Sequence, residues 1–192
     1  MDEVIIRKAN ENDFASIMEM PVKLAAHLEK TYDPTIKEDW FLGSEAREFY
    51  FDFLSDKQKC FFVAEEENKI IGFVTGELIE RTEFWYRKIN CFASLDEIFI
   101  DEEYRSKGIG AKLMTQFKDW CKEQGAERIN LEVSTTNVPA ILFYHKHAFQ
   151  DQYLIMETAL EGKQTTLVQE ENKTSLTQNE NLQNKNSTAI KL

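Results

Sequence analysis

The alternation of apolar and polar positions along the chain predicts short strands interleaved with helices. Apolar runs typical of strands occur at residues 4–7, 60–64, 70–76, 95–100, 128–133 and 153–160. The second and third runs are joined by the polar residues 65–69 and therefore predict a hairpin. The order of the elements predicts an α/β (α+β) domain, β-α-α-β-β-β-α-β-α-β, with a mixed, mostly antiparallel sheet of about six to seven strands flanked by about four helices.

Apolar residues recur at helical spacing in four segments, which are residues 11–30, a segment from residue 44 onward, residues 108–124 and residues 139–147. Asn10 marks the start of the first helix, because its side-chain oxygen can cap free amides. Pro21 lies inside that helix and lacks a backbone donor, so we expect a kink or a break there. The helix from residue 44 is expected to turn Phe49, Phe53 and Leu54 toward the core.

Composition separates a folded body from a polar tail. The chain has 192 residues, of which 42% are hydrophobic and 12% aromatic, which is ample for a packed core. In residues 161–192, by contrast, 16 of 32 residues are Asn, Gln, Ser or Thr and none is aromatic. Such a segment buries too little apolar area to offset its ordering entropy. We therefore expect a domain over residues 1–160 and a disordered tail over residues 161–192.

The charge of the chain restricts its partners. The net charge is −11, which argues against a general nucleic-acid-binding surface and favours a cationic molecule or a basic peptide. The sequence contains no apolar run long enough to span a membrane and starts without the layout of a secretory signal, so we expect a cytoplasmic protein. Cys60, Cys91 and Cys121 are about thirty residues apart, which predicts free thiols and no metal site.

A glycine-containing loop follows the strand at residues 95–100. Its residues are Arg105, Ser106, Lys107, Gly108, Ile109 and Gly110, and a helix begins directly after it. Free amides and the positive end of the helix dipole converge at such a point, which suits a pyrophosphate. An ordinary turn is the alternative interpretation. The loop matches neither the phosphate loop of nucleotide triphosphatases nor the three-glycine dinucleotide fingerprint.

A second segment of interest surrounds the helix at residues 139–147. Asn137 precedes this helix, and its amide is suited either to cap the helix or to bind a polar ligand. Tyr144 lies on the same helical face as Ala140 and Phe143. A tyrosine at such a position is usually part of the core, but its phenol is also a suitable proton donor to a departing thiolate.

Together the two segments resemble the GNAT superfamily of acetyl-CoA-dependent N-acetyltransferases. The resemblance rests on the loop at residues 105–110 and on a run about thirty residues later, formed by Asn137, Ala140, Phe143, Tyr144, Lys146 and Phe149. The order of elements agrees from residue 4 to residue 160. The chain departs from the family pattern at Ala148, where glycine usually precedes the phenylalanine.

The resemblance implies a binding site for acetyl-CoA, which acts as co-substrate without a metal. In the family, backbone amides of the loop bind the coenzyme A pyrophosphate, and the matching residues here are Arg105, Ser106, Lys107, Gly108, Ile109 and Gly110. The strand that pairs with the pantetheine matches Ile98, Phe99 and Ile100. The position of Asn137 contacts the pantetheine arm, and the position of Tyr144 lies beside the sulfur as general acid.

Asp96 and Glu97 are the candidates for the general base, which in the family is often a carboxylate or a water on the strand before the loop. Adjacent strand residues point to opposite faces, so one carboxylate faces the thioester unless a bulge turns both inward. We favour Glu97. The alternative is that either carboxylate ends a strand or orients a cationic substrate.

The resemblance therefore predicts an N-acetyltransferase that acts on a primary amine of a small cationic molecule, a peptide or a protein, by direct attack in a ternary complex. Acidic and aromatic residues within segments 20–45 and 80–88 suit a cationic substrate, and they equally suit a homodimer contact. The alternative function is a non-catalytic acyl-CoA-binding regulatory module. We expect neither a nucleic-acid partner nor a membrane partner.

Overall fold

A computed structural model describes residues 3–80, 91–156 and 158 of the chain. The chain divides into two compact units, Met1–Asp151 and Gln152–Leu192, and the architecture below is that of the first. The tail predicted over residues 161–192 and most of the predicted specificity segment at residues 80–88 lie outside the described residues. Within the described part of the chain, every helix is too short or too polar to span a membrane.

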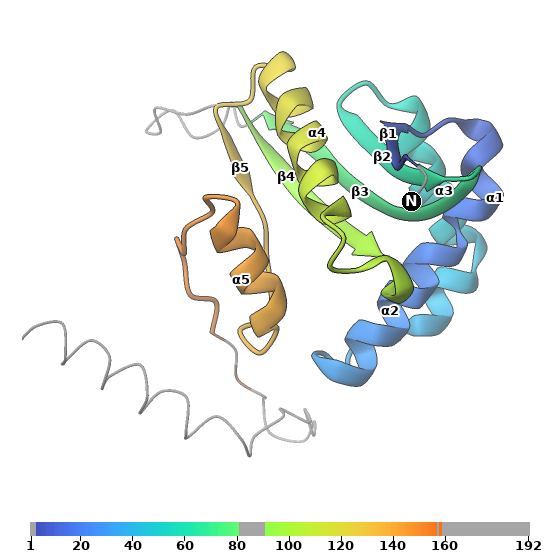
Figure 1. The fold of residues 1–192 in the computed structure, drawn as a ribbon. Helices are drawn as coiled ribbons and strands as arrows, with labels where there is room; N and C mark the ends of the chain where they lie inside the picture. The colour runs from blue at the N-terminus through green and yellow to red at the C-terminus, as the bar shows by residue number, and fades with distance from the viewer. Residues whose placement is uncertain (1–2, 81–90, 157, 159–192) are drawn as a thin grey trace, which may run out of the picture. The chain divides into compact units, whose positions relative to one another are not determined.

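The described residues form a sheet of five strands in the order β1-β2-β3-β4-β5 (Figure 1). The strands are β1 (Ile5–Lys8), β2 (Lys59–Glu66), β3 (Lys69–Glu80), β4 (Cys91–Ile100) and β5 (Arg128–Asn130). The first three neighbouring pairs are antiparallel, and β4 and β5 are parallel. The predicted mixed, mostly antiparallel sheet is confirmed, with fewer strands than the six to seven expected.

The missing strand is the one expected at residues 153–160. Residues 152–156 have no regular secondary structure, and residues 153–156 are strongly exposed; residues 157, 159 and 160 are outside the described part. The strand expected at residues 128–133 ends at Asn130. Apolar composition favours a strand, but a strand also needs a neighbour whose backbone supplies hydrogen bonds, which the composition of the segment does not reveal.

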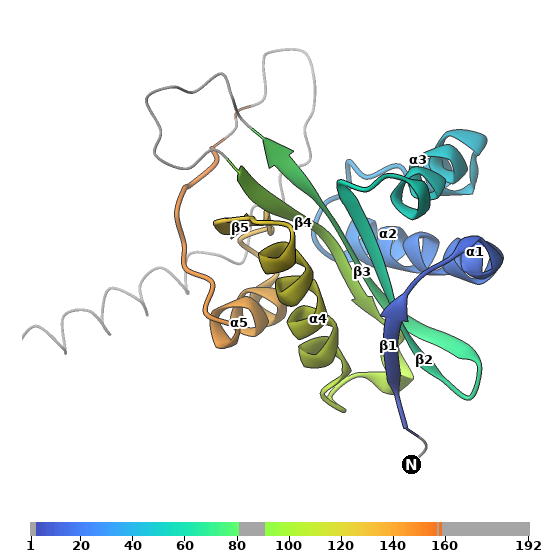
Figure 2. The ribbon, with the colours of Figure 1, turned by 90° about the horizontal axis from the view of Figure 1, so that it is seen from above.

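Helices cover both faces of the sheet. The α-helices are α1 (Phe14–Ile17), α2 (Glu19–Thr31), α3 (Ser44–Ser55), α4 (Ile109–Glu123) and α5 (Val138–Lys146), and the 3-10 turns are η1 (Glu11–Asp13), η2 (Glu38–Leu42) and η3 (Glu102–Tyr104). The first three helices lie on one face, and α4 and α5 lie on the other (Figure 2). Each face has its own hydrophobic cluster, which we call the α3-side cluster, with Tyr50, Phe61 and Phe99, and the α4-side cluster, with Leu95, Leu113 and Phe117.

The first predicted helix is interrupted at Met18 instead of Pro21. Asn10 caps η1 through its side chain, as expected. Pro21 occupies the first turn of α2, where the amide it lacks would have no partner within the helix, so the proline fits without a kink. In α3, Phe53 is buried as expected, but Phe49 is 44% exposed. Ala46, Tyr50 and Phe53 form the buried face, because they are spaced by four and three residues.

Candidate functional site

A β-bulge in β4 turns Glu97 toward the α3 side of the sheet. Thr75 pairs with Glu97, but the next residue, Gly76, pairs with Leu95, which leaves Asp96 as an extra residue. Leu95 accordingly packs in the α4-side cluster, whereas Glu97 contacts a residue of α3. Without the bulge, Leu95 and Glu97 would share a face, because side chains of a strand alternate.

The side chain of Glu97 accepts one hydrogen bond from the described residues, and its donor is a buried tyrosine. The hydroxyl of Tyr50 donates to Glu97 Oε1 over 2.7 Å, while Glu97 Oε2 is buried without a hydrogen-bond partner among the described residues. Burial raises the pKa of Glu97 to about 7, against the opposing effect of the Tyr50 hydrogen bond; the nearby charge of Asp96 raises it further. A carboxyl group with such a pKa can exchange a proton near neutral pH.

Asp96, the extra residue of the bulge, is exposed, and its charge raises the pKa of Glu97 and of Tyr50. The hydroxyl of Ser94 donates to Asp96 Oδ1 over 2.6 Å. Partial desolvation raises the pKa of Asp96, and the hydrogen bond from Ser94 opposes this shift. The charge of Glu77 raises the pKa of Asp96 further, and the charge of Lys59 lowers it. Of the two carboxylates, Glu97 is the one that contacts α3, through Tyr50, and Asp96 is the more exposed.

Next to the bulge, β4 loses its second neighbouring strand. The pairing of β4 with β5 ends where Ser94 meets Asn130, and after β5 the chain runs away from β4 toward α5 (Figure 1). Beyond that point Ile98, Phe99 and Ile100 pair with β3 alone among the described residues. One edge of this stretch therefore leaves its backbone groups available for an extended ligand.

The free edge leads directly to the predicted pyrophosphate loop. Ser106 and Gly108 have left-handed backbones, with φ of 63° and 80°, and α4 begins at Ile109. The first bond of the helix runs from Lys112 N to Gly108 O. The amides of Ile109, Gly110 and Ala111 consequently have no acceptor within the helix and are free to bind an anion.

Two cations of the loop lie against neighbouring groups. The Nε of Arg105 donates to Ile100 O over 3.0 Å, and the guanidinium lies 5.8 Å from the centre of the Phe99 ring. The Lys107 ammonium lies 4.8 Å from the centre of the Tyr104 ring. Arg105 thus binds the last residue of β4 and joins the strand edge to the loop.

Helix α5 lies against the start of α4. A Cβ on Gly110 would come within 3.2 Å of the Phe143 ring. Tyr144 packs between Phe143 and Phe149, with ring centres 5.6 and 5.8 Å away, and contacts the α4-side cluster. Burial raises the pKa of Tyr144 to about 12, so its phenol keeps its proton at neutral pH. Tyr144 and Glu97 therefore belong to opposite faces of the sheet.

The ends of α5 are fixed by local contacts. Asn137 Oδ1 accepts a hydrogen bond from Ala140 N over 3.2 Å, so the side chain caps the helix; its amide nitrogen donates to no residue in the described part of the chain. Ala148, where the sequence departs from the family pattern, adopts the left-handed region with φ of 65°. The turn that glycine usually forms is therefore present, with a conformational strain that glycine would not have.

A half-buried ion pair joins the segment after β4 to α2 of the opposite layer. Lys23 Nζ of α2 lies 3.0 and 3.2 Å from the two carboxylate oxygens of Asp101. Asp101 follows β4 and is buried, and its own amide donates to Ile71 O. The start of the predicted pyrophosphate loop is thus held by both the sheet and α2.

Sequence reasoning missed Tyr50, the partner of Glu97. The helical spacing of Ala46, Tyr50 and Phe53 would have indicated a buried tyrosine, but it does not specify which strand residue the hydroxyl meets. The three cysteines are free, as predicted, and Cys60 and Cys121 are buried. Among the described residues, no group of three or more His, Cys, Asp or Glu side chains is arranged to hold a metal ion.

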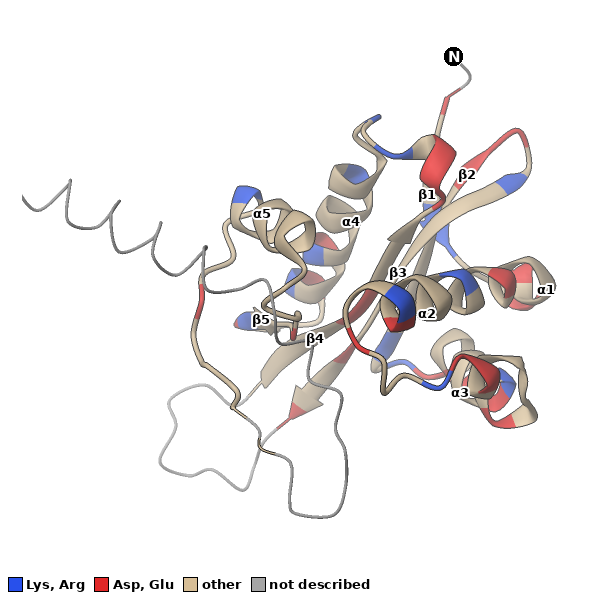
Figure 3. Cartoon of the chain, turned by 90° about the horizontal axis from the view of Figure 1, so that it is seen from below, with Lys and Arg blue, Asp and Glu red and all other residues tan. Residues whose placement is uncertain are grey.

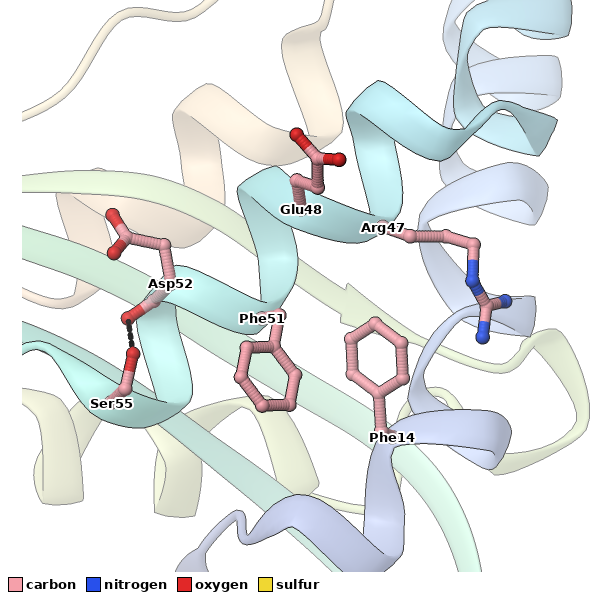
Figure 4. Close-up of a pocket in the computed structure, with 6 residues that line it drawn as sticks. All are labelled: Phe14, Arg47, Glu48, Phe51, Asp52 and Ser55. Atoms are coloured by element: carbon pink, nitrogen blue, oxygen red, sulfur yellow. Dashed lines mark hydrogen bonds between the residues drawn. The ribbon is translucent and has the colours of Figure 1, made fainter.

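A shallow pocket of about 380 Å³ lies elsewhere, on the outer side of α3 (Figure 4). It is lined by Phe14, Arg47, Glu48, Phe51, Asp52 and Ser55. None of these residues belongs to the β4 edge or to the loop, so the pocket is separate from the candidate site.

Acidic residues are prominent on η1 and α3, whereas α4 carries several lysines (Figure 3).

Comparison with known proteins identifies related sequences. A sequence profile of the Acetyltransferase (GNAT) family matches residues 24–149. An uncharacterized N-acetyltransferase of Methanocaldococcus jannaschii is 28% identical over 151 residues, which cover 78% of this chain and 62% of that protein. An N-alpha-acetyltransferase of Saccharolobus solfataricus is 30% identical over 127 residues, covering 62% of this chain and 74% of that protein. The match thus spans less than two thirds of the first relative.

Solved structures share the fold at lower sequence identity. A transcriptional regulator from Bacillus halodurans superposes with a TM-score of 0.66 at 18% identity, over 82% of this chain and 100% of that one. An aminoglycoside acetyltransferase, AAC(6')-Iy, in complex with a bisubstrate analogue of coenzyme A, superposes with a TM-score of 0.63 at 15% identity, over 83% of this chain and 99% of that one.

Proposed function

The chain belongs to the acetyltransferase (GNAT) family, and on this basis we propose that it transfers the acetyl group of acetyl-CoA to a primary amine. The amine belongs to a small cationic molecule, a peptide or a protein. The observation that carries the proposal is the free edge of β4, which starts beside Glu97 and ends at the loop whose amides point outward from α4.

Acetyl-CoA fits this edge in the following way. Ile98 and the amide of Ile100 face the open edge and offer backbone groups to the extended pantetheine, as a neighbouring strand would. Phe99 pairs with β3 between them, and Ile100 O is bound by Arg105. The loop from Arg105 to Gly110 binds the pyrophosphate through its free amides and its positive charge. The Asn137 amide nitrogen donates to the pantetheine arm, which leaves its oxygen to cap α5.

Glu97 and Tyr144 carry the proton transfers. The substrate ammonium gives a proton to Glu97 Oε2, and the nitrogen lone pair then forms a bond to the thioester carbonyl carbon. The C–S bond breaks, the sulfur takes the electron pair and receives a proton from Tyr144 Oη. The remaining extra proton of the attacking nitrogen restores the Tyr144 phenol, and Glu97 gives its proton to solvent, so the net products are an amide, free coenzyme A and one proton.

Glu97 and Tyr144 suit these roles because their environments give them different pKa values. With a pKa of about 7, Glu97 is ionised in a large fraction of molecules near neutral pH, and with a pKa of about 12, Tyr144 is protonated. Asp96, which is more exposed and bound to Ser94, attracts the cationic substrate. During the attack, a backbone amide of β4 stabilises the oxyanion.

Release of free coenzyme A tests the proposal. Purified protein is mixed with acetyl-CoA and polyamines, aminoglycosides, amino acids or basic peptides, and the thiol is measured with a chromogenic reagent. We expect release with one class of amine and at least a 100-fold loss of kcat in Glu97→Gln. Full activity of Glu97→Gln would refute the role of Glu97. Acetyl-CoA binding without turnover on any amine, including protein substrates, would favour a regulatory module instead.

A further inference from the structure

Tyr50 is the buried residue whose hydroxyl binds the candidate base, Glu97. It lies on α3, is 1% exposed and packs in the α3-side cluster. Its ring contacts Phe49 and Phe61 at centre distances of 5.1 and 6.4 Å. Packing on this scale fixes the ring, so the direction of the hydroxyl is set by the helix and not by the strand that it meets.

The hydroxyl of Tyr50 has one acceptor among the described residues, Glu97 Oε1. Burial and the charge of Glu97 raise the pKa of Tyr50, so the phenol remains a hydrogen-bond donor. A carboxylate has two equivalent oxygens, and the bond from Tyr50 makes them different. Oε1 is occupied, while Oε2 accepts no hydrogen bond from the described residues and is closed to solvent, so a substrate reaches it only after neighbouring side chains move. A buried carboxylate oxygen without a hydrogen bond is energetically costly.

We infer that Tyr50 is a positioning residue for acetyl transfer: it holds Glu97 by Oε1, so that Oε2 is the oxygen that receives the proton of the substrate ammonium. The inference rests on the proposed role of Glu97 as base. It adds to the site Tyr50 of α3, which lies on the other face of the sheet from α4 and α5. It also specifies which oxygen of Glu97 reacts.

The step moves one proton and requires no other reactant. The N–H bond of the ammonium breaks, its electron pair stays on nitrogen, and an O–H bond forms at Oε2. Glu97 becomes a neutral acid, and its hydrogen bond from Tyr50 to Oε1 persists but weakens, because the acceptor has lost its charge. Tyr50 therefore favours the ionised form of Glu97 that begins the reaction.

Removing the Tyr50 hydroxyl leaves the other charged groups near Glu97 in place. Asp96, on the same strand, raises the pKa of Glu97. Glu77 of β3 and Lys59 of β2 act on Asp96 in opposite directions. Removing the hydroxyl changes none of these residues, so a change in the pH dependence of the reaction reports on the hydrogen bond itself.

The test compares the pH dependence of kcat/KM in the wild type and four variants, one of them Glu97→Gln, with one acceptor amine throughout. Tyr50→Phe removes the hydroxyl and keeps the ring. Phe53→Leu disturbs the same helix and cluster without touching Glu97, and serves as the matched control for packing. Tyr50→Phe in the Glu97→Gln background tests whether Tyr50 acts through Glu97.

We expect Tyr50→Phe to lower kcat about tenfold and to move the acidic limb of the profile upward by about one pH unit, the effect of losing one charge-assisted hydrogen bond. Phe53→Leu should lower the melting temperature and leave that limb in place. In the Glu97→Gln background, Tyr50→Phe should change kcat by less than twofold, because the two residues act as a unit.

The outcomes separate this inference from the function on which it rests. Full activity of Glu97→Gln overturns the role of Glu97, and the positioning role falls with it. Loss of activity in Glu97→Gln, combined with an unmoved acidic limb in a folded Tyr50→Phe, overturns the positioning role alone. A shift of equal size in Phe53→Leu also overturns it, because packing would then account for the effect.

Discussion

Gly108 and Gly125 share one backbone conformation at the two ends of α4, with φ of 80° and 79°. In both cases a Cβ would meet no atom within 4 Å, so a substitution at either site acts through the backbone alone. Gly108 belongs to the predicted pyrophosphate loop, whereas Gly125 lies beyond the other end of the helix. The pair thus separates conformational strain from ligand binding.

Alanine at either glycine should lower stability by about 1 kcal/mol, because an L-residue is strained in the left-handed region. Only Gly108→Ala should also weaken acetyl-CoA binding, by about tenfold, since the loop amides must keep their directions. Chemical denaturation measures the first effect and calorimetric titration the second. Equal affinities in the two variants would place the pyrophosphate elsewhere.

Tyr144→Phe should lower kcat about 10- to 100-fold and leave the affinity for acetyl-CoA within about twofold, since it removes a proton donor and keeps the packed ring. Stopped assays of thiol release and direct binding titrations measure the two quantities. If affinity fell as far as kcat, the phenol would be a ligand-binding group and the acid would have to be sought elsewhere.

Glu97→Gln should stabilise the protein at alkaline pH and not at acidic pH. In the folded state the pKa of Glu97 is raised from 4.5 to about 7, so ionisation costs stability progressively as the pH rises between these values. Well above pH 7 the variant should gain about 3 kcal/mol, the equivalent of the shift from 4.5 to about 7, and below about pH 4.5 the gain should vanish. Thermal melts across this range give the comparison; a pH-independent difference would contradict the raised pKa.

Ala148→Gly should raise stability by up to about 1 kcal/mol, because residue 148 is left-handed and glycine adopts that region without strain. Ala111→Gly provides the contrasting control, since it lies in the first turn of α4, where glycine is expected to cost about 1 kcal/mol. Urea denaturation of the two variants should therefore show changes of opposite sign. Destabilisation by Ala148→Gly would mean that the methyl group makes a favourable contact.

Patterns local to one segment predicted much of the fold. The helix predicted over residues 108–124 corresponds to α4. The turn predicted over residues 65–69 consists of Glu67 and Asn68, which both have positive φ. The segment at residues 153–160 shows the limit of such patterns. Residues 153–156 are apolar but exposed. Strand formation depends on a partner strand elsewhere in the chain, which the apolar pattern of the segment does not encode.

The candidate site was predictable only in part for a similar reason. The loop and the helix after it follow from glycines and helical spacing within a few residues. The direction of Glu97 depends on the register of β3 against β4, where Asp96 is the extra residue. Its contact with Tyr50 joins residues 47 positions apart, and no periodicity within either segment encodes that distance.

The early end of the pairing between β4 and β5 also bears on the behaviour of the protein in solution. An open strand edge is a template for pairing with other chains and hence for aggregation. At Ile98, Phe99 and Ile100 this edge is rich in apolar side chains. A ligand that pairs with it would act as a protective cap, so preparations stripped of acyl-CoA are expected to lose monomer fastest.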